Sequence, residues 1–207
     1  MRRFDVVLFD LDGTLVDSNA LIVESMQQTA EAVLGRRFPY DRIAALVGGG
    51  SAARQLATLD PDRVDDLVCE YGNRIDSAYD AIECFVGVTD VLRELKAQGR
   101  LLGVVSAKRR EVVERALSAG GLAGMFDVVV GSDATAKHKP DPEPILKALE
   151  LLGADAARTA YVGDSPYDTQ AARAARVYAV AAGWGGLHRV EDADVLVESP
   201  GELLGVL

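Results

Sequence analysis

Short apolar runs alternate with segments of helical spacing along most of this chain. Phe4–Phe9 is predicted to be a buried strand, because charge bounds this apolar run on one side and glycine on the other. Further strands are expected at residues 101–105, 126–130, 159–162, 178–181 and 195–197, and helices at residues 87–99, 110–118, 142–152 and 166–176. Alternation with short connections predicts βαβ units, and therefore a parallel sheet with helices on both faces.

Residues 17–84 differ from the rest of the chain because no β-rich run interrupts them. Helical spacing covers residues 17–34, with Ser18 as a possible N-cap and Gly35 as a stop signal. Further helices are expected at residues 40–46, 51–58 and 61–79. We therefore expect an α/β fold, with a Rossmann-like parallel-sheet core at residues 1–16 and 85–207 and an inserted helical domain at residues 17–84.

Composition narrows the classes of partner. The 207 residues are 49% hydrophobic and carry a net charge of −10, which argues against nucleic acid or an anionic membrane surface as a partner. No apolar run reaches membrane-spanning length, so a cytoplasmic location is the default expectation. Cys69 and Cys84 have no metal-ligand partner at useful spacing and are interpreted as reduced structural thiols.

The richest chemistry directly follows the first strand, in the run Asp10-Leu11-Asp12-Gly13-Thr14-Leu15-Val16-Asp17. Two carboxylates, Asp10 and Asp12, lie two residues apart at a strand end, where they can serve an electrophile or a hard cation. Gly13 and Thr14 predict a tight turn whose backbone N–H groups approach an anion. The alternative is a solvated Asp-Gly turn, which does not require a second aspartate.

This run resembles the first motif of the haloacid dehalogenase superfamily in its phosphatase form. Three further motifs follow in the order of that family, each near a predicted strand end: Ser106 after residues 101–105, Lys139 in His138-Lys139-Pro140-Asp141-Pro142, and Asp164 in Gly163-Asp164-Ser165-Pro166-Tyr167-Asp168. Ligands bind at the carboxyl ends of the strands in such sheets. The resemblance also implies that residues 17–84 are an α-helical cap, with hinges near residues 16–18 and 83–87.

The resemblance implies a role for each matching residue. Asp10 is the candidate nucleophile, and Asp12 is the candidate general acid and base. Asp10, Asp164 and the backbone carbonyl of Asp12 are the expected Mg²⁺ ligands, which suits a cation that takes few protein oxygens. Asp168 is expected to orient a metal-bound water or to hold Lys139, rather than to bind the metal.

The same resemblance gives the expected contacts to the phosphoryl group. Ser106 and the Ala107 backbone N–H would donate to it, and Lys139 would neutralise its charge. Many relatives have Asn where this chain has Ala107, so one side-chain contact is missing. The neighbouring basic run at residues 108–110 is interpreted as solvated, and His138 as incidental.

The loop Gly48-Gly49-Gly50-Ser51 precedes a predicted helix and has the composition of an anion-binding turn. Arg54 could meet a carboxylate or a second phosphate of the substrate. The alternative, a flexible turn with a surface arginine, remains open at this stage.

Absent residues narrow the activity that the resemblance implies. Residues 17–84 contain no lysine and no histidine, whereas phosphonate-cleaving relatives use a cap lysine and sugar-phosphate mutases use a cap histidine and lysine. Dehalogenases of this superfamily lack the second aspartate, which is present here as Asp12. We expect a phosphomonoester hydrolase that acts on a small phosphorylated metabolite. The chain is most similar to the phosphoglycolate phosphatase-like group, which Trp184-Gly185 after the last motif also resembles. The protein is expected to be a monomer or a homodimer. Alternatives are a pyrophosphatase, a nucleotide or sugar-phosphate phosphatase, a phosphotransferase and a non-catalytic binding protein.

Overall fold

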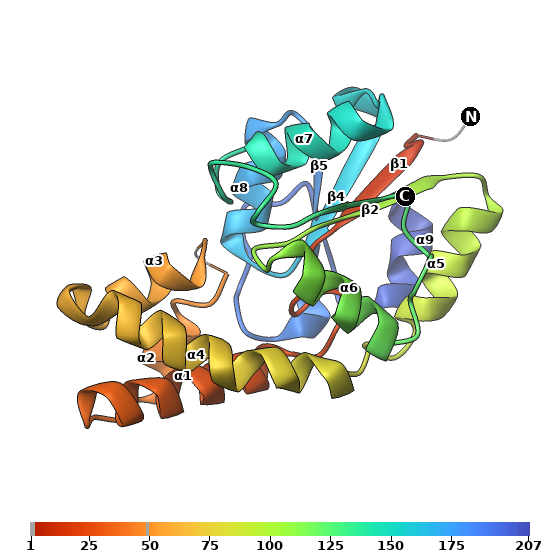
Figure 1. The fold of residues 1–207 in the computed structure, drawn as a ribbon. Coiled ribbons are helices and arrows are strands. Elements are labelled where there is room, and N and C mark those ends of the chain that lie inside the picture. Colours follow the sequence, from red (N-terminus) through yellow and green to blue (C-terminus); the bar gives the residue numbers. More distant parts are fainter. Residues whose placement is uncertain (1–2, 49) are drawn as a thin grey trace.

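The computed structural model describes residues 3–48 and 50–207, and these residues form a six-stranded parallel sheet (Figure 1). The strand order is β3-β2-β1-β4-β5-β6, so β1 and β4 occupy the centre. The strands are β1 (Val6–Phe9), β2 (Leu101–Val105), β3 (Val128–Val130), β4 (Thr159–Gly163), β5 (Tyr178–Ala182) and β6 (Val195–Val197). The expected α/β fold with a Rossmann-like parallel sheet is confirmed.

Helices cover both faces of the sheet, and the alternation of side chains along β1 explains why. Val7 and Phe9 belong to the same buried cluster as the apolar residues of α5 (Val88–Ala97), α6 (Arg110–Ala119) and α9 (Leu203–Val206). Val6 and Leu8 point to the opposite face and are buried with apolar residues of α7 (Glu143–Leu152) and α8 (Pro166–Ala174). A strand buried on both faces needs the continuous apolar sequence that β1 has.

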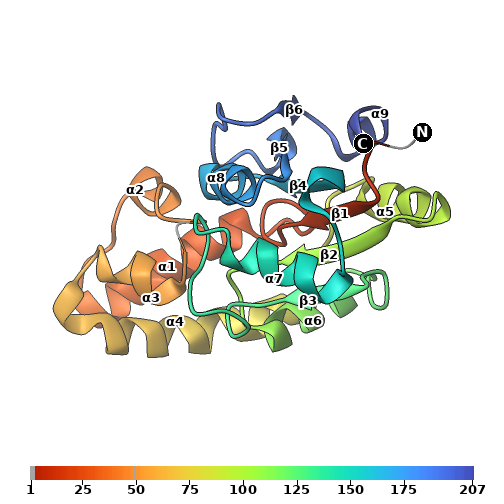
Figure 2. The same cartoon turned by 90° about the horizontal axis from the view of Figure 1, so that it is seen from above.

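Four helices lie together beyond the carboxyl ends of the strands (Figure 2). They are α1 (Asn19–Leu34), α2 (Tyr40–Ala44), α3 (Ala52–Ala57) and α4 (Val64–Ala78). Helix α1 packs against α2 and α4, and α3 packs against α4. In the part of the chain that the structure describes, no helix combines the length and apolar composition needed to cross a bilayer.

The two segments that connect these helices to the sheet run side by side. Val16 and Cys84 form an isolated antiparallel bridge. Asp17 N donates to Glu83 O at 2.9 Å, and Phe85 N donates to Leu15 O at 3.1 Å. The division into core and cap stays a prediction, and a hinge between the two parts would lie at this pairing.

Several predicted boundaries were wrong, and each has a local cause. Residues 61–79 are not one helix, because short 3₁₀ turns, Pro61–Arg63 and Tyr79–Ala81, flank α4. The third strand begins at Val128 rather than at residue 126, since the Asp127 carboxylate accepts a hydrogen bond from Leu102 N at 2.8 Å. Ser18 precedes α1 but makes no capping hydrogen bond, whereas Gly35 ends α1 in the left-handed conformation as expected.

Candidate active site

Three neighbouring strands end in polar residues that the sequence singled out. Phe9 of β1 pairs with Val104 of β2 on one side and with Val162 of β4 on the other. The same register brings together the residues that follow these strands, which are Asp10, Ser106 and Asp164. All three are nearly buried. The strand order therefore assembles one site from segments that are far apart in the sequence.

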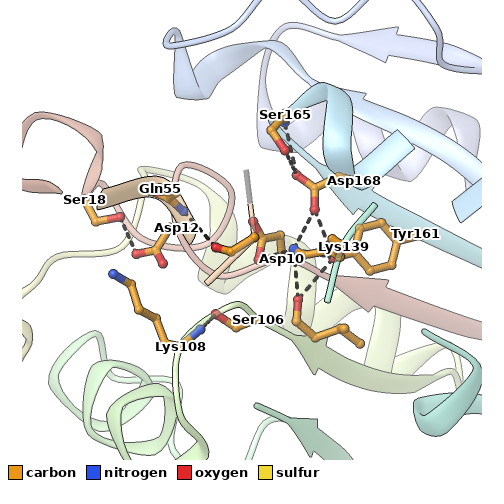
Figure 3. Close-up of polar contacts among 12 residues, drawn as sticks. Asp10, Asp12, Ser18, Gln55, Ser106, Lys108, Lys139, Tyr161, Ser165 and Asp168 are labelled. Atoms are coloured by element: carbon orange, nitrogen blue, oxygen red, sulfur yellow. Dashed lines mark hydrogen bonds and ion pairs between the residues drawn. The ribbon is translucent and has the colours of Figure 1, made fainter. Parts of the chain in front are cut away.

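Lys139 lies at the centre of this site, although it belongs to a loop rather than a strand (Figure 3). Its Nζ is 2.8 Å from Asp10 Oδ1 and 2.6 Å from Asp168 Oδ1. It also donates to the Tyr161 hydroxyl at 3.0 Å and to the Val105 carbonyl at 3.3 Å. The side chain is only 5% exposed, so the ammonium is a fixed positive charge beside Asp10.

The pKa values of this cluster follow from burial and from mutual charge. Burial raises the pKa of Asp10 to about 7, with Lys139 acting to lower it and Asp168 and Asp12 acting to raise it. Burial also raises the pKa of Asp164 well above its usual value, and Asp168 and Asp10 add to the effect. Burial lowers the pKa of Lys139, but Asp10 and Asp168 outweigh this effect and raise it well above the ordinary value. One lysine does not fully compensate the crowded carboxylates.

Asp168 is held by hydrogen bonds on both of its oxygens. Oδ1 accepts from Lys139 and from the Tyr161 hydroxyl, the latter at 3.2 Å. Oδ2 accepts from the backbone N–H of Ser165 at 3.1 Å and from its hydroxyl at 2.5 Å, which closes a capping box at the start of α8. Oxygens engaged in this way favour a role in positioning Lys139 over direct binding of a metal.

The remaining carboxylates form an oxygen-rich site suited to a hard cation. One carboxylate oxygen from each of Asp10, Asp164 and Asp168 lies within 4.8 Å of the others, and all three residues are buried. Since Asp168 is already saturated, Asp10 and Asp164 are the side chains best placed to bind a metal. Asn19 Nδ2 donates to Asp164 Oδ2 at 3.0 Å and to Gly185 O at 3.1 Å, which fixes the orientation of the Asp164 carboxylate. A buried acidic pair with raised pKa values fits Mg²⁺, because a cation would restore the charged forms.

Asp12 points away from this cluster toward the helical segment (Figure 3). Its Oδ1 accepts a hydrogen bond from Ser18 Oγ at 2.7 Å and another from the Tyr79 hydroxyl. Tyr79 is fully buried, and it follows α4 close to the segment that returns to the sheet. The carboxylate of Asp12 is thus held by two hydroxyls from residues 17–84.

A cavity of about 440 Å³ lies between the helices α1, α3 and α4 and the ends of the strands. Asp10, Asp12, Lys139 and Asp164 line it from the sheet side, and Ala107 and Lys108 line it from the loop after β2. Its apolar wall comes from Ile22, Val47, Val68 and Ile75 of the helical segment and from Val112 of α6. A volume of this size suits a small molecule, and the charged groups on the sheet side can fix its orientation.

The sequence model of the haloacid dehalogenase-like hydrolases matches residues 7–182, which run from the second residue of β1 to the end of β5. The chain belongs to this family. The match covers all four motifs and the helical segment between the first two, so the resemblance seen in the sequence is confirmed.

Curated relatives and solved structures agree with this assignment. The chain is 36% identical to a provisionally assigned pyrophosphatase PpaX of Caldanaerobacter subterraneus subsp. tengcongensis, over 99% of this chain and 95% of that protein. It is 34% identical to pyrophosphatase PpaX of Halalkalibacterium halodurans, over 99% and 97%. A provisionally assigned phosphoglycolate phosphatase from Lactobacillus plantarum superposes with a TM-score of 0.84 at 28% identity and covers 100% of both chains. The chain is thus similar to hydrolases of phosphate bonds within the haloacid dehalogenase-like family.

The prediction that the N–H groups of the turn after β1 bind an anion was wrong. The N–H groups of Gly13 and Thr14 donate to Val16 O at 3.0 Å and to Leu11 O at 3.4 Å, so they do not face an anion. Gly13 is required for space: its φ is +71°, and an added Cβ would lie 2.0 Å from Asp164 Oδ2. Thr14 O accepts from Trp184 Nε1 at 2.9 Å, which ties the turn to the loop after β5.

The predicted phosphoryl-binding residues lie together. Ser106 Oγ accepts from Lys108 N at 3.1 Å, which leaves its hydrogen available for donation. Ala107 lines the cavity beside Lys139, and its N–H has no acceptor within the described parts of the chain. Both remain candidates to bind an anion.

The structure corrects the interpretation of Lys108, whereas the role of Arg54 stays a prediction. Lys108 was predicted to be solvated, but it is partly buried and lines the cavity. Arg54 is exposed and does not line the cavity, although Ser51 caps its helix by accepting from Arg54 N at 3.4 Å. Gly48 and Gly50 do line the cavity, whereas the middle glycine of the predicted loop, Gly49, lies outside the described residues.

Sequence reasoning missed several residues of the site. Asn19, Tyr79 and Tyr161 each contact a motif carboxylate, and His188 lines the cavity and lies 2.9 Å from Val47 O. The sequence did offer one indication of Asn19. A polar residue in the first turn of the helix that follows the first motif lies close to the strand ends that carry the motif carboxylates. The tyrosines had none, because their spacing is that of ordinary buried positions.

Proposed function

We propose that this protein is a Mg²⁺-dependent phosphohydrolase that acts on a small phosphorylated metabolite through an aspartyl-phosphate intermediate. The observation that carries the proposal is the buried contact of Lys139 Nζ with Asp10 Oδ1 at 2.8 Å, at the edge of the 440 Å³ cavity. A carboxylate that faces a substrate-sized cavity beside a fixed cation is suited to attack an anionic phosphoryl group. In this proposal residues 17–84 act as the cap that covers the reacting groups.

In the first step, an Asp10 carboxylate oxygen forms a bond to phosphorus while the bond from phosphorus to the leaving oxygen breaks. Lys139, Ser106 and the Ala107 N–H stabilise the charge on the transferring group. Asp12 donates a proton to the leaving oxygen, which departs as an alcohol or as phosphate. Asp168 acts through Lys139, whose ammonium it holds at 2.6 Å.

In the second step, water attacks the phosphorus of the aspartyl-phosphate and the bond to Asp10 breaks. Asp12 now accepts the proton from the water, so each turnover returns both aspartates to their starting forms. Asp10 and Asp164 are the side chains that would hold Mg²⁺, together with the Asp12 carbonyl that the family resemblance implies. When bound, the cation neutralises charge on the phosphoryl oxygens and orients them for in-line attack.

Two substrate classes have support. Phosphoglycolate-like monoesters are suggested by the sequence motifs and by the fold shared with the Lactobacillus plantarum protein. Pyrophosphate is suggested by the 36% and 34% identities to pyrophosphatase PpaX sequences over almost the whole chain. Both are small and carry an anionic group besides the phosphoryl group that is transferred.

The test is phosphate release from phosphoglycolate, pyrophosphate, sugar phosphates and nucleotides, with and without Mg²⁺. We expect release from at least one small anionic substrate, and EDTA should lower it by at least about a hundredfold in a manner reversed by added Mg²⁺. Asp164→Asn should raise the Mg²⁺ concentration needed for half-maximal activity. Release that persists in EDTA would contradict the metal assignment, and no release from any member would contradict the hydrolase proposal.

Tyr79→Phe tests the position of Asp12. The substitution keeps the buried ring and removes the hydroxyl that donates to Asp12 Oδ1. We expect kcat to fall by about tenfold, with an altered pH profile, because a hydrogen bond to a charged group is lost at the proposed acid and base. Tyr40→Phe is the matched control, since Tyr40 is 48% exposed on α2. An unchanged kcat and pH profile in Tyr79→Phe would rule out the positioning role.

A further inference from the structure

One cation in the cavity has no role in the chemistry described so far. Lys108 extends from the loop after β2 toward Asp12 and the helical segment (Figure 3). Its Nζ is 3.2 Å from the Tyr71 hydroxyl, and it lies 5.4 Å and 5.2 Å from the ring centroids of Tyr71 and Tyr79. Two aromatic faces thus hold the ammonium in one place.

Lys108 forms no ion pair within residues 3–48 and 50–207. The two acidic residues that share its part of the cavity are engaged elsewhere. Asp12 accepts hydrogen bonds from Ser18 and Tyr79, and Asp76 pairs with Arg109 at 3.4 Å. Burial lowers the pKa of Lys108, but Tyr71 and Asp12 outweigh that effect, so the pKa is raised and the ammonium stays charged. The ammonium is therefore a fixed positive charge that lines the cavity and is available to an anion.

Tyr71 supplies a second donor at the same place. Its side chain belongs to α4, is 3% exposed and lines the cavity. The hydroxyl oxygen accepts from Lys108 Nζ, and its hydrogen has no acceptor among the residues that the structure describes. A hydroxyl that accepts from an ammonium becomes a better donor to an anion.

We propose that Lys108 and Tyr71 form a second anion subsite, which binds the anionic group of the substrate that is not transferred. The inference rests on the proposed function and narrows it to small substrates with two anionic groups. The second group is a carboxylate in a phosphoglycolate-like substrate and a phosphate in pyrophosphate. The subsite takes the role that the sequence suggested for Arg54, which does not line the cavity.

Paired substrates test the subsite. Phosphoglycolate and ethyl phosphate are similar in size, but only phosphoglycolate carries a second anionic group. We expect Lys108→Met to lower kcat/KM for phosphoglycolate by about tenfold to a hundredfold and to leave ethyl phosphate within about twofold. Tyr71→Phe should show the same selectivity with a smaller effect, and Lys108→Arg should recover part of the loss. Parallel assays with pyrophosphate show whether the second group is a carboxylate or a phosphate.

Two outcomes of this assay would overturn the proposal. One is an equal loss of kcat/KM for both substrates in Lys108→Met, and the other is a selective loss in Arg54→Ala rather than in Lys108→Met. Lys147→Met serves as the control variant, because Lys147 lies on α7, pairs with Glu150 and does not line the cavity. Melting temperatures of all variants establish that each one is folded.

A binding experiment separates the subsite from the hydrolase proposal. Calorimetry with Mg²⁺ present compares methylenediphosphonate, which is not hydrolysed, with methylphosphonate. We expect the wild-type protein to bind the diphosphonate at least about tenfold more tightly and Lys108→Met to lose that preference. This result supports the subsite even if no substrate is hydrolysed. A preference that survives in Lys108→Met overturns it, whatever the hydrolysis assays show.

Discussion

Replacement of Asp10 by asparagine is expected to lower phosphate release by about 10⁴-fold or more while the protein stays folded. The amide keeps the shape of the side chain but is a poor nucleophile for phosphorus. Folding should survive because two effects oppose each other. The variant loses the ion pair with Lys139 at 2.8 Å, and it also relieves the crowding of carboxylates whose oxygens lie within 4.8 Å of one another. Lys139 keeps its contact with Asp168.

Steady-state phosphate release and a thermal melt check this expectation together. Asp90→Asn is a suitable control, because the side chain of Asp90 is 86% exposed on α5 and does not line the cavity. Turnover close to the wild-type rate in Asp10→Asn would exclude Asp10 as the nucleophile. Loss of the folded state instead would assign Asp10 a structural role.

Lys139→Met is expected to abolish activity and also to destabilise the protein. The ammonium is surrounded by Asp10, Asp168, the Tyr161 hydroxyl and the Val105 carbonyl, and no other cation in the described structure pairs with the two carboxylates. Removing one partner of a buried ion pair leaves uncompensated charge, which costs about 3–5 kcal/mol in the free energy of unfolding. The loss should be largest in metal-free buffer, and added Mg²⁺ should restore part of the stability but not the activity.

Denaturant unfolding with and without Mg²⁺ measures this effect. Lys137→Met is the matched control, since Lys137 lies on the same loop, is 68% exposed and pairs with Asp141 at 3.1 Å. An exposed pair of this kind contributes at most about 1 kcal/mol. If Lys137→Met and Lys139→Met have equal unfolding free energies, the buried ion pairs of Lys139 do not stabilise the fold.

Much of the architecture was predictable because the pattern is local. Periodicity two in the strands and 3.6 in the helices reports which faces are buried, and every predicted strand is present within a few residues of its expected bounds. The errors fall at boundaries such as residues 61–79, where a single helical pattern hides two 3₁₀ turns. Such ends depend on capping contacts, for example that of Asp127 with Leu102, rather than on periodicity.

The motif aspartates and Lys139 were identifiable for a related reason. Each follows a strand or occupies a distinctive loop, and parallel strands bring their carboxyl ends to one edge of the sheet. Their individual roles as nucleophile, acid and metal ligand remain predictions that the experiments above test. The contacts of Gly13 and Thr14 were not predictable, because the amides of the turn could have faced either an anion or their own chain.

The sequence by itself determined the fold class, the family and the set of carboxylates at the ends of the strands. Only the tertiary structure decided that Lys108 and Tyr71 share the cavity, that Tyr79 holds Asp12 and that Arg54 does not line the cavity. The reason is physical: periodicity and turn chemistry are set by neighbours a few residues away. The burial and partners of a side chain depend on segments such as α4 and the loop after β2, which are distant in sequence and meet only when the chain packs.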